Sequence, residues 1–267
     1  MNVLIAIPVY KREELAYNCI MSLLNNTRVP DGINVTVMVG INEANKEFIY
    51  VMESMASNIN GMTFKVRMYT ENLGKPKVVN DIAKSNKFDY LVSLDGDMIC
   101  VQPDWLIGML SVYREYNRSP IYATVDGKRT AIPMGGLCGN QFGNSCHQLT
   151  ENTANVIVKK IANHTVITSI GIGGIAGGIL MCDLESWTAI GGYSSAHVYG
   201  GDDGYFFGRC YATKRLFAYT KTIGFYHPYE LNKKYQDWKN RALNMIRGDG
   251  PVLTKSELKG FKFDENN

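Results

Sequence analysis

The sequence lacks a long uninterrupted apolar run. Its longest apolar stretch, 171–182, is broken by glycines and falls short of the roughly 20 residues that a transmembrane helix needs. The amino terminus also lacks a basic leader with a small-residue cleavage site, because residues 3–7 already form a β-branched apolar run. We therefore expect no transmembrane segment and a cytoplasmic location, which would be the host cytoplasm for a phage-encoded chain.

Cysteine pairs at regular spacing and a strong charge of one sign are also missing. The six cysteines are scattered, mostly in apolar contexts, so reduced core thiols fit better than a disulfide framework. The net charge of +3 is too small to indicate nucleic-acid binding by itself, although it permits anionic substrates. A length of 267 residues with 45% hydrophobic content suits one large α/β domain or two small ones.

The first part of the chain alternates between two kinds of apolar pattern. Short β-branched runs predict strands over 3–7, 33–41, 64–68 and 90–94, and one-sided apolar stripes predict helices over 13–24, 47–55 and 75–84. This alternation is typical of an α/β fold with a mostly parallel central sheet flanked by helices. Ligands of such sheets bind at the carboxyl ends of the strands.

The second part of the chain is less regular. We expect helices over 104–116, 184–190 and 202–211, strands over 175–182 and 216–225, and a basic carboxyl-terminal helix over 232–246. The segment 130–148 is rich in Gly and Asn with little periodicity, which predicts a long mobile loop that closes over the sheet edge.

Two carboxylates stand where the apolar run 90–94 stops. Asp95 and Asp97 are separated only by Gly96, a pattern that suits a hard divalent cation carrying phosphate oxygens. Taken alone, the same three residues also fit an ordinary solvated turn.

A second acidic pair and one histidine follow later in the chain. Asp202 and Asp203 come after two glycines at an expected helix start, where the helix dipole favours ionised acids and where one of them could simply be a cap. His227 follows the last expected strand and could complete a metal site with Asp97, or could be structural.

These motifs, taken in order, resemble those of the GT-A fold glycosyltransferases, especially family 2 and the related β-1,4-galactosyltransferase-like group. The motifs that carry the resemblance are Ile7-Pro8-Val9-Tyr10-Lys11-Arg12, Asn72-Leu73-Gly74-Lys75 with Asn80, Asp95-Gly96-Asp97, Gly177-Gly178, Gly191-Gly192-Tyr193 and Gly200-Gly201-Asp202-Asp203. The resemblance implies a single Rossmann-like nucleotide-diphospho-sugar transferase domain over 1–267. Within it, 1–97 would bind the donor nucleotide, 98–230 would bind the acceptor, and 231–267 would form a basic helix and tail.

The resemblance also implies roles for individual residues. The expected donor-binding residues are Pro8, Val9, Tyr10, Arg12, Asn42, Lys75, Asp95 and Gly96. The expected ligands of Mn²⁺ or Mg²⁺ are Asp97, His227 and Asp95. Asp203 is expected to be the general base of an inverting transfer, with acceptor contacts from Tyr199, Gly201 and Asp202.

Two departures from the family pattern limit what can be carried over. Asn42-Glu43 stands where the family often has an aspartate that reads uracil, although a UDP-sugar remains the first expectation. Asp202 replaces a glutamate, so the acceptor is open: a saccharide, a lipid-linked glycan or hydroxymethylated bases of phage DNA.

Three other classes of protein fit the sequence less well. A nucleotidylyltransferase would need a glycine-rich phosphate loop after the first strand, and Pro8-Val9-Tyr10 is not one. A dinucleotide-binding oxidoreductase is suggested only by the glycines of 171–176, which precede an expected strand instead of following one. A non-catalytic carbohydrate-binding protein of the same fold is the alternative from a different class, and the retained acids argue against it.

Overall fold

Strand β1 (Asn2–Tyr10) lies in the interior of a large sheet, paired in parallel with β2 (Asn34–Asn42) and β5 (Tyr90–Leu94). Strand β4 (Met62–Tyr69) extends the parallel part next to β2, and the two-residue β3 (Asn58–Ile59) borders it. The intervening helices are α1 (Glu13–Asn26), α2 (Lys46–Ser54) and α3 (Gly74–Ser85). The computed structural model describes residues 1–143, 155–170, 177–194, 202–228, 233–234 and 236–237, and the backbone of 261–263.

The second part of the chain continues the same sheet with mixed strand directions. Its strands are β6 (Ile99–Cys100), β9 (Met134–Gly143), β10 (Val156–Ile161), β11 (His164–Ser169), β12 (Ile179–Asp183) and β13 (Leu216–His227). The order across the sheet is β10-β11-β13-β9-β12-β5-β1-β2-β4-β3, and β6 pairs with β13. The α/β fold is therefore confirmed, but its sheet is mixed, because β12 runs antiparallel to both β5 and β9.

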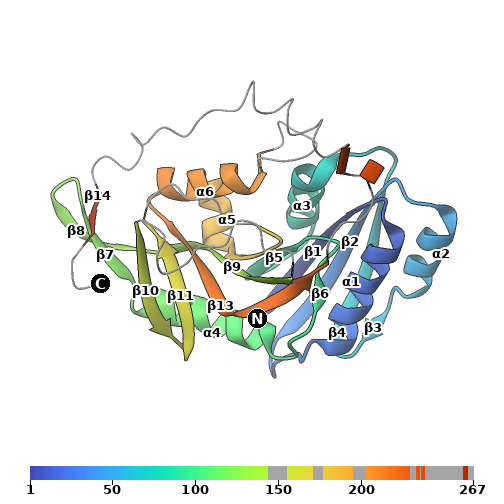
Figure 1. Ribbon diagram of the computed structural model, residues 1–267, viewed down its shortest axis with the longest axis horizontal. Helices are drawn as coiled ribbons and strands as arrows, with labels where there is room; N and C mark the ends of the chain where they lie inside the picture. The colour runs from blue at the N-terminus through green and yellow to red at the C-terminus, as the bar shows by residue number, and fades with distance from the viewer. Residues whose placement is uncertain are drawn as a thin grey trace.

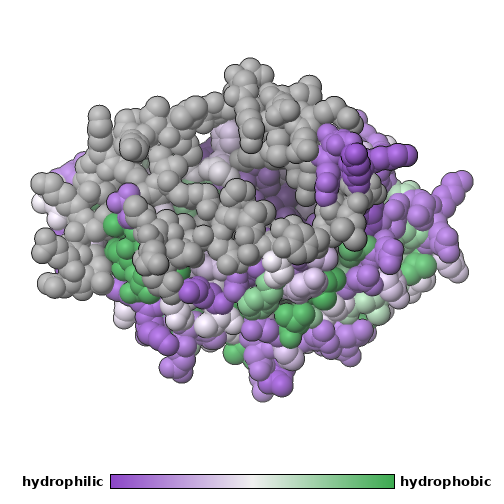
Figure 2. All heavy atoms as spheres, viewed as in Figure 1, coloured by the Kyte–Doolittle hydropathy of each residue, from purple (hydrophilic) through white to green (hydrophobic). Residues whose placement is uncertain are grey.

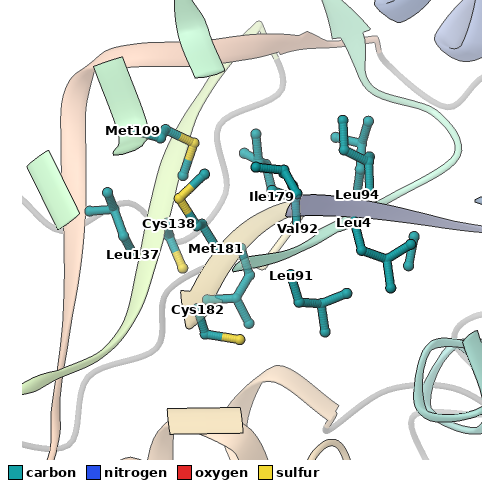
Figure 3. Packing of buried hydrophobic residues seen from close by; sticks show 14 of the residues in the cluster. Leu4, Leu91, Val92, Leu94, Met109, Leu137, Cys138, Ile179, Met181 and Cys182 are labelled. Carbon is teal, nitrogen blue, oxygen red and sulfur yellow. The ribbon is translucent and has the colours of Figure 1, made fainter. Parts of the chain in front are cut away.

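Helices cover both faces of this sheet. Figure 1 shows α3, α5 (Leu184–Ile190) and α6 (Asp202–Ala212) on one side and α4 (Trp105–Arg118) on the other. Figure 3 shows side chains of β1, β5, β12 and β9 packed together, with Met109 of α4 beside them. The two halves of the chain thus share one hydrophobic core.

A small second sheet lies at one end of the molecule. It joins β14 (Phe261–Phe263), β7 (Ile121–Val125) and β8 (Lys128–Ile132). The hairpin of β7 and β8 turns through Asp126 and Gly127, whose φ angles of 52° and 77° are left-handed, as expected for a two-residue hairpin turn.

The expectation of a mobile loop over 130–148 is wrong for its described part. Residues 130–132 belong to β8, and β9 occupies 134–143 as a buried strand between β12 and β13. The glycines serve close packing: a Cβ at Gly136 would lie 2.9 Å from Leu180, and one at Gly139 would lie 2.8 Å from Ile179. Glycine thus marks close approach of neighbouring side chains in this strand. Residues 144–148 lie outside the described residues.

Most other expected elements are confirmed within a few residues. Helix α5 has the expected bounds, whereas β12 begins at Ile179 instead of residue 175. The basic helix expected over 232–246 lies mostly outside the described residues. No helix in the described part of the chain is both long and apolar enough to cross a membrane.

Exposed apolar side chains are dispersed over the described surface. Tyr50, Val101 and Leu184 are the most exposed of them, and they lie in three separate segments of the chain. Figure 2 shows mainly hydrophilic residues on the described part of this face, with smaller hydrophobic groups between them. Such scattered exposure is ordinary for a globular protein.

Candidate active site

The turn after β5 presents the first pair of carboxylates at the edge of the sheet. Asp95 follows Leu94 directly, and its backbone N–H donates to the carbonyl of Gly178 at 2.8 Å. The glycine between the acids lies against β1, since a Cβ at Gly96 would be 3.1 Å from the carbonyl oxygen of Pro8. The expected donor-side turn and the acidic turn are therefore neighbours.

Asp97 lies between two cationic or potentially cationic side chains. Arg12 Nη1 donates to Asp97 Oδ2 at 2.7 Å, and His227 Nε2 lies 3.5 Å from the same oxygen. Burial of Asp97 favours its neutral form, but the hydrogen bonds and charges of His227 and Arg12 outweigh burial and hold the pKa of this carboxyl well below its usual range. Asp97 is therefore ionised at neutral pH, as a metal ligand must be.

The backbone directs Arg12 toward this site. Lys11 and Arg12 both have φ angles of 53° in the left-handed region, directly between β1 and α1. Two successive non-glycine residues in that region are energetically costly, at about 1 kcal/mol or more each. The strained turn leads from β1 into α1 and allows the Arg12 side chain to meet Asp97.

Lys75, at the start of α3, joins the two acidic pairs. Its Nζ lies 2.9 Å from Asp95 Oδ1, 3.1 Å from Asp202 Oδ2 and 3.2 Å from Asp203 Oδ1. Burial opposes the charged form of Lys75, but the three carboxylates together raise the pKa of its ammonium well above its usual value. Both clusters are thus parts of one site.

Asp203 is held at the start of α6 by contacts with a glycine as well as with Lys75. The backbone N–H of Gly177 donates to Asp203 Oδ2 at 3.0 Å, and any Cβ at Gly177 would clash with this carboxylate. Burial is the largest influence on the pKa of Asp203, and together with the neighbouring carboxylates it raises this pKa to about 7 in spite of Lys75. A carboxylate with this pKa can accept a proton efficiently near neutral pH.

The neighbouring Asp202 has a different environment. Its Oδ2 is buried and pairs with Lys75, yet among the described residues it makes no hydrogen bond. A carboxylate oxygen with unused acceptor capacity suits a substrate hydroxyl.

The donor set at Asp97 fits a divalent cation. The His227 imidazole lies 3.5 Å from one oxygen of the Asp97 carboxylate. A carboxylate together with an imidazole suits Mn²⁺ better than Mg²⁺, which prefers oxygen ligands. Among the described residues, no group of three or more His, Cys, Asp or Glu side chains is arranged to hold a metal ion. Asp95, the third expected ligand, is instead paired with Lys75, so diphosphate oxygens of a donor would have to complete the coordination.

Two other residues expected at the donor site lie around it. The Asn42 side chain is buried; its Nδ2 donates to the carbonyl of Val9 at 3.3 Å, and its Oδ1 accepts from the N–H of Leu73 at 3.0 Å. Asn42 thus ties the end of β1 to the segment before α3. Tyr10 lies under Lys11, whose Nζ is 5.0 Å from the centre of the ring. Tyr199 and Gly201, expected at the acceptor site, lie outside the described residues.

Sequence reasoning assigned no role to the clamp between Asn80 and Tyr193. Asn80 Nδ2 donates to the carbonyl of Tyr193 at 2.9 Å, and the N–H of Tyr193 donates to Asn80 Oδ1 at 3.0 Å. The Tyr193 ring centre lies 5.5 Å from Lys75 Nζ. The signal for this contact was already present, because both residues occur in motifs that carried the resemblance.

The sequence of the amino-terminal part agrees with this geometry. Residues 4–133 match the family described as glycosyl transferase family 2. The amino-terminal part of the chain is thus family 2-like, and the chain as a whole has the GT-A fold. The resemblance to family 2 is therefore confirmed, whereas the one to the β-1,4-galactosyltransferase group stays a prediction. No curated protein sequence matches the chain.

Solved structures of other glycosyltransferases share the fold. The mannosyltransferase PcManGT from Pyrobaculum calidifontis, in complex with GDP-Man and Mn²⁺, is 13% identical with a TM-score of 0.63, covering 97% of this chain and 68% of that one. TarS 1–349 from S. aureus is 12% identical with a TM-score of 0.59, covering 94% and 73%. GalNAc-T7 with UDP, GalNAc and Mn²⁺ is 16% identical with a TM-score of 0.59, covering 87% and 44%.

Removal of the Lys75 charge should destabilise this glycosyltransferase. In Lys75→Met three neighbouring carboxylates lose their shared cation, and we expect the free energy of unfolding at pH 8 to fall by about 3 kcal/mol, as when one partner of a buried pair is removed. The loss should shrink at pH 5, where Asp203 is protonated. Urea denaturation at both pH values measures this, with Lys77→Met, an exposed position on the same helix, as control. Equal stability of Lys75→Met and the wild type at pH 8 would contradict the bridging role.

Proposed function

We propose that this glycosyltransferase is a metal-dependent, inverting enzyme that moves a sugar from a nucleoside diphosphate sugar to an acceptor hydroxyl. The observation that carries the proposal is the position of two acidic clusters on either side of Lys75. One contains Asp97 with His227, and the other contains Asp202 and Asp203. Inverting transfer needs such a division, with leaving-group stabilisation on one side and a base on the other.

The first cluster would serve the leaving group. Asp97 and His227 would hold Mn²⁺ or Mg²⁺, which when bound neutralises the charge that develops on the departing diphosphate. Arg12 already contacts Asp97, and its guanidinium is suited to phosphate oxygens once the carboxylate turns toward a metal. Asp95 is held by Lys75, close to where the donor ribose is expected.

The second cluster would serve the acceptor. Asp203 takes the proton of the attacking hydroxyl, and its raised pKa suits that task because burial and neighbouring carboxylates increase its basicity. Asp202 accepts a hydrogen bond from an acceptor hydroxyl through its buried Oδ2. Attack from this side, opposite the diphosphate, inverts the anomeric centre.

The donor is proposed to be a UDP-sugar. TarS 1–349 has been solved in complex with UDP-GlcNAc and GalNAc-T7 with UDP, which supports this choice, whereas PcManGT was solved with GDP-Man. The Asn42 side chain does not indicate which nucleobase the donor carries, because both of its polar atoms are hydrogen-bonded to the backbone. The acceptor is proposed to be a saccharide or lipid-linked glycan, with hydroxymethylated DNA bases as the alternative.

A donor screen tests the proposal. Purified protein would be incubated with UDP-, GDP-, ADP- and dTDP-sugars, each with Mn²⁺, with Mg²⁺ or with a chelator, and the release of nucleoside diphosphate would be measured. We expect slow hydrolysis of a UDP-sugar that requires the metal and is faster with Mn²⁺. Tight binding of a sugar without hydrolysis of any donor would instead favour a non-catalytic carbohydrate-binding protein.

The pH dependence should report Asp203. The charged form of this carboxylate is the active base, so kcat/KM should rise with pH through about 7, the pKa of Asp203, and level off above it. The quantity kcat/KM reports groups of the free enzyme. Rates measured from pH 5 to 9 at constant ionic strength, in the wild type and in Asp126→Asn as an exposed control, test this. A rise centred near pH 4 would show a base in an ordinary environment and contradict the assignment.

A further inference from the structure

A cavity of about 720 Å³ lies between the carboxyl-terminal end of α3 and helix α5, and Asn2 and Asp89 at the amino-terminal ends of β1 and β5 also line it. Neither acidic cluster lines it. Asn80 and Gly192 do, and Asn80 clamps Tyr193, whose ring lies 5.5 Å from Lys75. The cavity thus extends from the amino-terminal ends of the strands to Asn80, which links it through Tyr193 to Lys75, and its size is typical of a small-ligand site.

An aromatic side chain with spare hydrogen-bonding capacity forms part of this cavity. Trp187 of α5 is partly exposed, and its ring is 5.8 Å from that of Tyr193 and 6.0 Å from that of Phe206. Within the described ranges its indole N–H makes no hydrogen bond. A rigid aromatic surface with a free donor is suited to a sugar ring, which presents both C–H groups and hydroxyl acceptors.

The rim of the cavity is cationic. Lys84 and Lys87 line it, both are exposed, and neither forms an ion pair with any described residue. Arg209 lies at the Gly191 edge, where a Cβ would be 3.0 Å from its Nη2. The lining acid, Asp89, already accepts the backbone N–H of Asn2 at 2.7 Å. The positive charges are therefore available to a ligand.

We propose that this cavity binds an anionic sugar unit of the acceptor, with the ring against Trp187 and its phosphate or carboxylate at Lys84 and Lys87. Lysine recognises such groups as a point charge, without the bidentate geometry of arginine. The place of this unit in the reaction rests on the proposed function, because it would lie one or more sugars away from the reacting hydroxyl. Binding itself requires neither nucleotide nor metal.

Saturation-transfer NMR of the full chain tests the inference with four probes: glucose 6-phosphate, glucuronate, glucose and inorganic phosphate. We expect both anionic sugars to bind at least tenfold more tightly than glucose or phosphate alone. Lys84→Glu/Lys87→Glu and Trp187→Phe should each weaken the anionic sugars by tenfold or more, whereas Lys77→Glu on the same helix should not. Binding of phosphate as tight as that of the sugars, or unchanged binding in both cavity variants, would overturn the proposal.

The same probes separate this inference from the proposed function. Asp97→Asn should retain wild-type affinity for glucose 6-phosphate, and Lys84→Glu/Lys87→Glu should retain wild-type donor hydrolysis. Absence of donor hydrolysis together with normal sugar binding would remove the transfer reaction and leave the cavity as a binding site. Normal hydrolysis without binding of either anionic sugar would remove the cavity assignment alone.

Discussion

Asp97→Asn should abolish metal-dependent sugar transfer. The neutral amide binds a divalent cation less well than the carboxylate, so the departing diphosphate would develop charge without compensation, at a cost of several kcal/mol of transition-state stabilisation. The effect should be large because Asp97 is ionised and is the acid nearest His227 and Arg12. Transfer rates with saturating Mn²⁺, compared between the variant and the wild type, measure the loss.

Two comparisons make this result specific. Asp104→Asn, which alters an exposed ion pair with Arg28, should leave the rate unchanged, because exposed pairs contribute little. His227→Ala should weaken metal affinity by about 10 to 100-fold or more. Full turnover of the wild type in excess chelator would contradict a metal role for Asp97.

Asp203→Asn should lower transfer by about 10² to 10⁴-fold, the usual contribution of a positioned general base. The amide keeps the size of the side chain and one acceptor oxygen, which can meet Lys75 or the N–H of Gly177 but not both, and it has no basic oxygen. Donor binding should remain almost unchanged, since Lys75, the donor-side residue that contacts Asp203, keeps its ion pairs with Asp95 and Asp202. Transfer rate and donor affinity, measured in the same preparation, separate a base from a helix cap.

A cap function would produce a different pattern. Loss of a cap costs about 1 kcal/mol of stability and leaves the chemistry intact. A near-normal transfer rate in Asp203→Asn, or a product with retained anomeric configuration, would contradict the assignment and point to Asp202. Asp126→Asn, on an exposed turn, provides the matched control.

Local patterns predicted the amino-terminal part of the fold well because they coincide there with tertiary structure. The apolar run before Asp95 is a strand paired with β1, and the stripe on 75–84 is the buried face of α3. Each of these elements buries a regular face, so its period is visible in the sequence.

The central strand β9 could not be predicted in this way. Its glycines resemble a loop in sequence, and only the closeness of Leu180 and Ile179 explains them. The hairpin of the edge strand β10 and its neighbour β11 was also missed; it joins the sheet through a non-local pairing of β11 with β13. Strand propensity depends on such neighbours more than helix propensity does.

The candidate site was predictable by residue type but not by pairing. The acids, Lys75 and His227 were all identified from motifs, yet the resemblance assigned Lys75 to the donor, and Asp95 to both the donor and the metal. Lys75 pairs with Asp95 at 2.9 Å and also contacts Asp202 and Asp203. These contacts depend on how α3 packs against other elements of the fold. Distances between residues more than 100 positions apart cannot be read from a single sequence.

The most direct test of the account is a calorimetric titration of UDP, with and without Mn²⁺, into the wild type, Asp97→Asn and Asp203→Asn. We expect Mn²⁺ to strengthen binding to the wild type and to Asp203→Asn by similar factors and to have little effect on Asp97→Asn. Equal enhancement in Asp97→Asn, or its loss in Asp203→Asn alone, would contradict the division of the site into a metal-binding cluster and a separate base.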